Sequence, residues 1–146
     1  MIWLANELKK EGYLPGIVSR GYKGLSNNNP ILINSSSSPS DVGDEPLIIH
    51  KNTNCPVVIG SNRVNAAKFL IEKTSCNILI SDDGLQHFKL GRDIEIAMID
   101  GIRKFGNNLL IPAGPLREPI KRLEQIDFVI NTCLLYTSPS PRDSSK

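Results

Sequence analysis

The sequence has little that would link it to a membrane span, a nucleic acid or an oxidising compartment. No apolar run approaches the ~20 residues that a transmembrane helix needs, and no signal-peptide pattern is visible. A formal net charge of +2 at pH 7 gives no argument for a nucleic-acid partner. The three cysteines, Cys55, Cys76 and Cys133, show no C-x-x-C spacing, which argues against a disulfide framework or a zinc site. These absences predict a cytoplasmic protein.

The C-terminal residues differ in character from the rest of the chain. From Cys133 the sequence Cys-Leu-Leu-Tyr-Thr-Ser-Pro-Ser-Pro-Arg-Asp abandons the strand-like pattern before it. This run is identified as the translation of a transposase-type sequencing-library adapter, with residues 144–146 read from an index barcode. A genuine Ser/Pro-rich disordered tail is the alternative. We therefore expect the fold to lie within residues 1–132 and residues 133–146 to be disordered.

Residues 1–132 alternate between helical and strand patterns, and 40% hydrophobic content allows a real core. Helices are expected over residues 2–11, 63–73 and 120–126, and strands over residues 14–19, 30–34, 55–60, 78–80, 94–99 and 128–130. The apolar face of the helix over 63–73 is expected to hold Val64, Ala67, Phe69, Leu70 and Ile71. Repeated strand and helix with buried strands predicts an α/β fold, with a doubly wound, mostly parallel sheet and flanking helices.

The most informative stretch covers residues 78–87. Three apolar residues predict a short buried strand, which is followed by Asp82, Asp83 and Gly84, with His87 four residues after Asp83. Ligands of open α/β sheets bind just outside the carboxyl ends of the strands, so a carboxylate pair there is placed to hold a divalent metal. An Asp-Asp-Gly surface turn is the plain alternative, because Asp and Gly favour turns anyway.

Two further segments have both a functional and a plain interpretation. Arg20 opens a basic, glycine-punctuated loop over residues 20–24, which predicts either a solvated turn or a phosphate contact. Asp44 follows a Ser-rich run, residues 34–40, that we expect to be a loop. Asp41 or Asp44 could cap a helix with Pro46 in its first turn, so an N-cap is the plain interpretation of Asp44.

Phosphoryl transfer needs a metal site, a cradle for the nucleotide phosphates and a group that orients or deprotonates the acceptor hydroxyl. The acidic pair and Asp44 are candidates for the metal site and the base. The cradle has no candidate, because the sequence G-x-x-x-x-G-K-S/T occurs nowhere in the 146 residues. The residues alone thus indicate an α/β domain with a site for a phosphate or a metal.

Five segments, in this order along the chain, resemble the tetraacyldisaccharide 4'-kinase family of lipid A biosynthesis, a family of P-loop-type kinases. They are residues 19–22 (Ser-Arg-Gly-Tyr), 42–46 (Val-Gly-Asp-Glu-Pro), 81–87 (Ser-Asp-Asp-Gly-Leu-Gln-His), 92–93 (Arg-Asp) and 110–119 (Leu-Ile-Pro-Ala-Gly-Pro-Leu-Arg-Glu-Pro). The last run is the most distinctive. The resemblance implies a P-loop NTPase-like fold and transfer of the ATP γ-phosphate, with Mg²⁺, to the 4'-hydroxyl of a lipid A precursor disaccharide. It also implies a protein at the cytoplasmic face of the inner membrane.

The resemblance also implies roles for particular residues. Asp44 matches the aspartate proposed as catalytic base, and His87 and Glu118 match further active-site residues. Asp82, with Asp83 beside it, matches the carboxylate on the metal side of the site. Positioning and cofactor-binding roles are expected for Arg20, Gln86 and Arg117.

The sequence also departs from the family pattern. The family's phosphate loop lies immediately before the helix that opens here, so we expect Met1 to be an internal methionine of a longer protein. The membrane-associating segment and the C-terminal half of the family, including a histidine thought to pair with the catalytic aspartate, are also missing. We therefore expect the parent protein to be the kinase and this polypeptide to be inactive. A non-kinase metal or phosphate binder, and a half-domain that aggregates, are the alternatives.

Overall fold

The computed structural model describes residues 1–20 and 29–132. Most of the glycine-punctuated loop after Arg20 and the whole tail over 133–146 lie outside the described residues. The chain divides into two compact units, residues 1–91 and residues 92–146.

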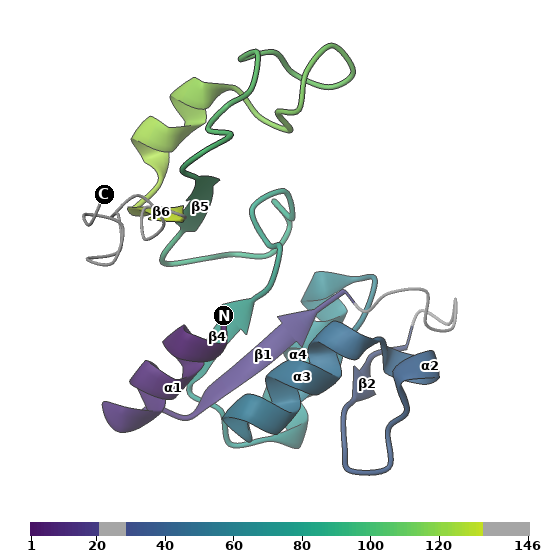
Figure 1. The fold of residues 1–146 in the computed structure, drawn as a ribbon. Coiled ribbons are helices and arrows are strands. Elements are labelled where there is room, and N and C mark those ends of the chain that lie inside the picture. Colours follow the sequence, from purple (N-terminus) through teal and green to yellow (C-terminus); the bar gives the residue numbers. More distant parts are fainter. Residues whose placement is uncertain (21–28, 133–146) are drawn as a thin grey trace, which may run out of the picture. The chain divides into compact units, whose positions relative to one another are not determined.

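The first unit is a mixed α/β sheet with flanking helices (Figure 1). Its four-stranded sheet has the order β2-β3-β1-β4, in which β1 is parallel to β3 and β4 while β2 is antiparallel to β3. Its elements in chain order are α1 (Ile2–Lys10), β1 (Pro15–Ser19), β2 (Ile31–Leu32), α2 (Pro39–Val42), α3 (Asp44–Thr53), β3 (Val57–Ile59), α4 (Arg63–Lys73) and β4 (Ile78–Ser81). The expected α/β class is confirmed.

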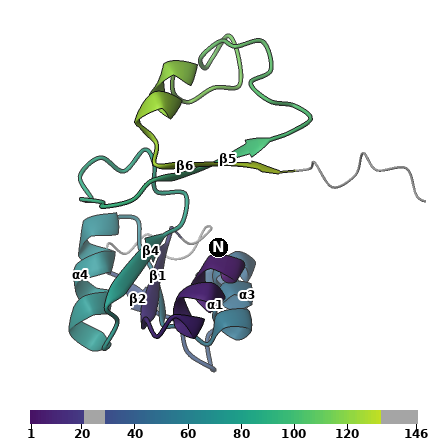
Figure 2. The same ribbon diagram turned by 90° about the vertical axis from the view of Figure 1, so that its left-hand side faces the viewer.

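Helices cover both faces of this sheet, α4 on one side and α1 with α3 on the other (Figure 2). Because successive residues of a strand point to opposite faces, Ile17 of β1 packs into the core shared with α1 and α3, whereas Val18 packs toward α4. Both are at most 1% exposed. Burial on both faces explains why the central strands are continuous apolar runs.

Local signals place two helix ends as the sequence predicts. Gly12 follows α1 with φ of 85°, and the backbone N–H groups of Gly12 and Tyr13 donate to Lys9 and Leu8. This is the Schellman arrangement, which needs a left-handed residue after the helix. At the start of α4, the Asn62 side chain accepts a hydrogen bond from the Asn65 N–H at 3.1 Å.

Three sequence predictions for the first unit are wrong in part. The face of α4 that is buried contains Arg63, Ala66, Ala67 and Leu70, whereas Ile71 is 54% exposed. In β4 only Ile80 is buried, because β4 is an edge strand of the four-stranded sheet. The Ser-rich run is a loop only in its first part, since α2 already begins at Pro39.

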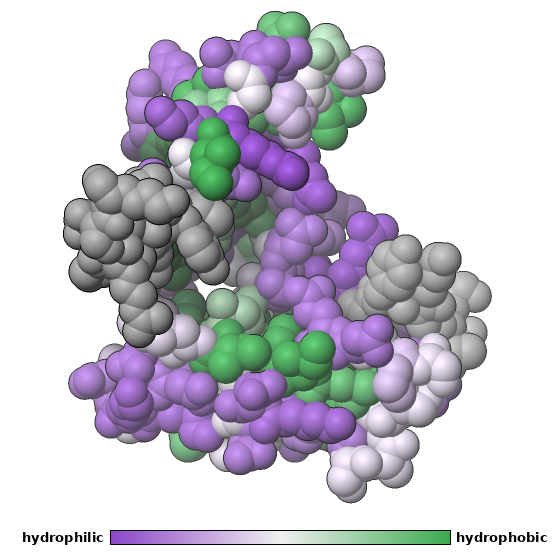
Figure 3. Space-filling model, viewed as in Figure 1, coloured by the Kyte–Doolittle hydropathy of each residue, from purple (hydrophilic) through white to green (hydrophobic). Residues whose placement is uncertain are grey.

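Apolar (green) residues also remain exposed on the α1 and α3 side of the first unit (Figure 3).

The second unit contains two parallel strands, β5 (Ile96–Asp100) and β6 (Phe128–Thr132), paired in their own two-stranded sheet. The 3-10 helix η1 (Ile120–Gln125) precedes β6, where the sequence predicted an ordinary helix. Residues 109–119 form the expected irregular loop, closed by backbone hydrogen bonds between its two ends, Ile111 to Leu116 and Leu116 to Leu109. None of the helices in the described part of the chain has the length and apolar character that spanning a bilayer requires.

Candidate functional site

The carboxyl ends of β1 and β4 meet at one edge of the parallel sheet, and polar residues follow both strands there. The backbone N–H of Asp82 donates to the carbonyl of Val18 at 2.9 Å, which continues the pairing of the two strands past the end of β4. The Ser19 hydroxyl then donates to Asp82 Oδ2 at 3.5 Å. Asp82 is half-buried and Asp83 is exposed. The first carboxylate is therefore held at the sheet edge, where α/β proteins bind ligands.

The chain turns sharply after these carboxylates. Asp83 has φ of 47°, a left-handed conformation that Asp tolerates better than most residues. A side chain at Gly84 would bring its Cβ within 2.7 Å of Ser81 Oγ, so the turn packs closely against β4. The N–H of His87 then donates to the carbonyl of Gly84 at 3.0 Å. The plain interpretation, an Asp-Asp-Gly turn, is confirmed. The turn lies at the edge of the sheet where α/β proteins bind ligands, and the metal site stays a prediction.

Arg63, the first residue of α4, is a buried cation beside this turn. Its side chain is 3% exposed, and Nη2 donates to the backbone carbonyl of Asp82 at 2.9 Å. Within residues 1–20 and 29–132, neither its Nε nor its Nη1 has a hydrogen-bond partner. Burial lowers the pKa of the guanidinium, the negative charges of Asp82 and Asp83 oppose that effect, and the charge of Arg20 adds to it. Arginine nevertheless stays protonated in proteins.

Sequence reasoning missed Arg63, although a signal for it was present. The positive end of the helix macrodipole disfavours a cation in the first turn, and Arg63 directly follows the N-cap residue Asn62. A cation in that position needs another reason to be there. The apolar face expected for α4 did not include Arg63, and so the sequence assigned this residue no role, whereas the buried face of the helix contains it.

An open cleft of about 540 Å³ lies between the start of α4 and the turn after β4. Residues 61–64 line one side and residues 86–90 the other. The structure thus brings Gln86 and His87, two predicted site residues, together with Arg63. Both are half-buried.

Asp44 and Arg20 lie at the same edge of the sheet. Arg20 is exposed and directly follows β1. The helix α3 precedes β3 and packs against it, so that its N-terminus lies toward the carboxyl ends of the parallel strands (Figure 1). Asp44 is the first residue of α3 and is exposed, while Gly43 occupies the N-cap position without a side-chain cap. The interpretation of Asp44 as an N-cap is therefore wrong, and Pro46 lies in the first turn as predicted.

The acidic pair fits a hard divalent cation. Mg²⁺ takes one or two protein carboxylates and completes its shell with water and phosphate oxygens, and Asp82 and Asp83 supply oxygen donors of that kind. Across the described ranges, no three or more His, Cys, Asp or Glu side chains form a group that could enclose a metal. A closed zinc-type cage would need such a group, whereas an open magnesium site does not.

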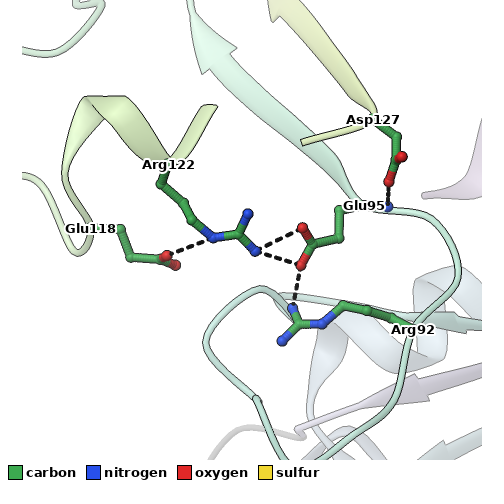
Figure 4. Close-up of polar contacts among 5 residues, drawn as sticks. All are labelled: Arg92, Glu95, Glu118, Arg122 and Asp127. Atoms are coloured by element: carbon green, nitrogen blue, oxygen red, sulfur yellow. Dashed lines mark hydrogen bonds and ion pairs between the residues drawn. The ribbon is translucent and has the colours of Figure 1, made fainter. Parts of the chain in front are cut away.

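The predicted site residues Glu118 and Arg117 belong to the second unit. Arg117 is exposed. Arg122 of η1 reaches Glu118 Oε2 with its Nε at 3.4 Å and Glu95 with its Nη2 at 2.7 Å, and Arg92 approaches Glu95 at 3.0 Å (Figure 4). Attraction to Glu95, with a smaller contribution from Glu118, raises the pKa of Arg122. Alternating charges thus hold Glu118, at the end of the loop, against the residue that leads into β5.

A sequence model of the tetraacyldisaccharide-1-P 4'-kinases matches residues 1–144 of the chain. The chain belongs to this family. The resemblance carried by the five short segments is thereby confirmed.

Curated relatives named tetraacyldisaccharide 4'-kinase share about half of the aligned residues. The protein of Nitrosococcus oceani is 51% identical over 130 residues, which are 89% of this chain and 38% of that protein. The protein of Legionella pneumophila (strain Corby) is 52% identical over 130 residues, or 89% of this chain and 40% of that protein. The chain therefore spans about two fifths of the length of these tetraacyldisaccharide 4'-kinases.

A solved tetraacyldisaccharide 4'-kinase structure, that of LpxK from Aquifex aeolicus described as an "apo" form in complex with ATP, has the same fold. It matches 95% of this chain and 44% of its own chain with a TM-score of 0.80 and 31% sequence identity. The P-loop kinase architecture expected from the sequence is confirmed by this match. The domain bounds expected from the sequence, 1–132 and 133–146, and the residue roles stay predictions.

Proposed function

We propose that the complete protein, of which this chain spans about two fifths, is an ATP-dependent kinase. It transfers the γ-phosphate to the 4'-hydroxyl of a tetraacyldisaccharide 1-phosphate precursor of lipid A. Membership of the family and the ATP named for the Aquifex aeolicus structure support the reaction and the cofactor. The observation that carries the proposal within this chain is the half-buried Asp82 carboxylate at the sheet edge, with Asp83 in the turn beside it.

In this proposal Asp82 and Asp83 hold Mg²⁺, because an open oxygen site at the carboxyl ends of parallel strands suits that ion. When bound, the ion neutralises negative charge on the nucleotide phosphates. Ser19 restrains the Asp82 carboxylate through its hydroxyl. Backbone pairing of Asp82 with β1 fixes the direction in which that side chain leaves the sheet.

Asp44 acts as the general base in this proposal. Asp44 is the first residue of the ten-residue helix α3, and its side chain is exposed, so that it can meet an incoming hydroxyl. It accepts the proton of the 4'-hydroxyl as that oxygen attacks phosphorus. Arg20, Gln86 and Arg117 orient phosphate or sugar groups, and His87 and Glu118 act as further active-site residues.

The chain by itself is proposed to be inactive. Tight binding of nucleotide phosphates relies on a cradle of backbone N–H groups with a lysine, and no G-x-x-x-x-G-K-S/T sequence occurs in the 146 residues. The complete enzyme is proposed to act at the cytoplasmic face of the inner membrane as a peripheral protein, where its lipid substrate lies. A non-kinase binder of metal or phosphate is the alternative function, and family membership does not favour it.

The test is transfer of radiolabelled γ-phosphate from ATP to the disaccharide by the complete protein. We expect Asp44→Asn to abolish turnover while ATP affinity changes by less than about twofold, because Asn keeps the shape but cannot accept the proton at neutral pH. The matched control is Asp41→Asn, an exposed carboxylate in α2, which should keep full turnover. Full turnover by the Asp44→Asn enzyme would remove Asp44 from catalysis, and transfer by residues 1–132 alone would refute the inactivity of the chain.

A further inference from the structure

The guanidinium of Arg63 has more donors than the described structure uses. Nη2 donates to the carbonyl of Asp82 at 2.9 Å, but Nε and Nη1 have no partner within residues 1–20 and 29–132. Together these two atoms carry three N–H hydrogens. The side chain is 97% buried by area, since its exposed fraction is 3%. Buried polar groups are normally hydrogen-bonded, and an unpaired one needs an explanation.

A purely structural role does not account for this arrangement. A structural arginine in an α/β core usually forms a forked ion pair with a carboxylate. Here the attraction to Asp82 and Asp83 acts through space, and the direct hydrogen bond goes to a backbone carbonyl instead. The residue also stands at the positive end of α4, where its own helix repels it. Both facts make the site more favourable once an anion is present.

The surroundings of Arg63 are suited to an anion. Arg63 lines the open cleft together with Ser61 and Asn62 at the start of α4 and with His87 and Lys89 of the opposite turn. The start of an eleven-residue helix directs backbone N–H groups into the same space. Several hydrogen-bond donors therefore line this part of the cleft. The hydrogen bond from Arg63 to the Asp82 carbonyl connects it to the turn that carries the acidic pair.

We propose that Arg63 is a binding residue for phosphate oxygens, which its free Nε and Nη1 hold at the wall of the cleft beside the acidic pair. This inference rests on the proposed function for its ligand class and deepens it by adding a residue to the site. Phosphate is available from two sources in that reaction, the nucleotide and the 1-phosphate of the disaccharide. Arg63 recognises what both sources share, a phosphate group that offers two acceptor oxygens to the guanidinium.

The first experiment observes the guanidinium directly in the 146-residue chain. In a ¹⁵N–¹H spectrum, the Nε–H signal of Arg63 is assigned as the one that disappears from the spectrum of the Arg63→Lys variant. The signal of the exposed Arg103 is assigned in the same way with Arg103→Lys. The protein is titrated with inorganic pyrophosphate and, in a parallel experiment, with sodium chloride at the same ionic strength. We expect the Arg63 signal to shift saturably with pyrophosphate alone, and the Arg103 signal to respond equally to both salts. An Arg63 signal that moves no more than that of Arg103 overturns the proposal.

The second experiment identifies the source in the complete kinase. Arg63→Lys keeps the charge but loses the fork, so we expect a rise of at least about tenfold in one KM. A rise for ATP alone assigns the nucleotide, and a rise for the disaccharide alone assigns its 1-phosphate. Two unchanged KM values overturn the proposal. General structural damage does not explain a rise in one KM alone, because such damage would not be selective. A wild-type enzyme without transferase activity would refute the proposed function, whereas the pyrophosphate titration would still decide the role of Arg63.

Discussion

Replacing Arg63 by Met should leave the first unit as stable as before or make it slightly more stable. Methionine fills a similar elongated space with an apolar chain and removes two buried nitrogen atoms that lack a partner among the described residues. Each unpaired atom costs about 1–3 kcal/mol, which gives a gain of about 4 kcal/mol at the middle of that range.

The losses in this variant are of similar size. The hydrogen bond from Nη2 to the Asp82 carbonyl, at 2.9 Å, comes from a charged donor and contributes about 1.5–3 kcal/mol. The through-space attraction to the half-buried Asp82 and the exposed Asp83 adds about 1 kcal/mol. The net change in the free energy of unfolding is therefore about 1 kcal/mol in favour of the variant.

Urea unfolding of the 146-residue chain, followed by far-ultraviolet circular dichroism, measures this change. With a slope of about 1–3 kcal/mol per molar urea, the midpoint should rise by about 0.3–1 M at constant slope. Arg103→Met, at an exposed position, should change the free energy of unfolding by less than about 0.5 kcal/mol. A loss of about 3 kcal/mol or more at Arg63 would refute the reasoning, because a loss of that size is typical of breaking a buried structural ion pair.

Three other changes test the fold and the second unit. Leu70→Ala should lower the free energy of unfolding by about 2–5 kcal/mol because Leu70 is 0% exposed, whereas Ile71→Ala, at 54% exposure, should cost about 1 kcal/mol or less; equal losses in urea unfolding would contradict the assigned face of α4. Gly84→Ala should cost about 1–3 kcal/mol in the same assay, because its Cβ would lie 2.7 Å from Ser81 Oγ, and an unchanged midpoint would mean that the turn can relax. Glu95→Gln should weaken the hold of Arg122 on Glu118 and lower kcat of the complete kinase about tenfold, whereas the exposed Glu124→Gln should not; equal rates for the two variants would show that this ion-pair chain has no part in the reaction.

Short-range chemistry fixed many of the elements that the sequence predicted correctly. Gly12 ends α1 because a left-handed residue lets two N–H groups return to the last helical carbonyls. Asn62 begins α4 because its side chain accepts the N–H of Asn65. The strand around Val57 and the turn at Gly84 follow from equally local preferences. These signals extend over only a few residues, so the linear order of residues is enough to reveal them.

The five family segments were also visible in the sequence, since a motif is a linear pattern. What they identified was the family and its P-loop kinase fold. They could not give the geometry of the site. The contact between Ser19 and Asp82 joins residues 63 positions apart, and only the pairing of β1 with β4 creates it.

Only the tertiary structure decided which side chains of α4 and β4 are buried. Ile71 and Leu79 were expected in the core from their hydrophobicity, yet they are 54% and 37% exposed, because α4 turns a different stripe toward the sheet and β4 is an edge strand. The same rotation of α4 buries Arg63 beside Asp82, 19 residues later in the chain. The spacing of hydrophobic residues indicates that a segment is a helix, but the surface against which the helix packs decides which of its sides is buried. The sequence therefore determined the family and the acidic pair, and the packing of α4 against the sheet placed a buried cation beside them.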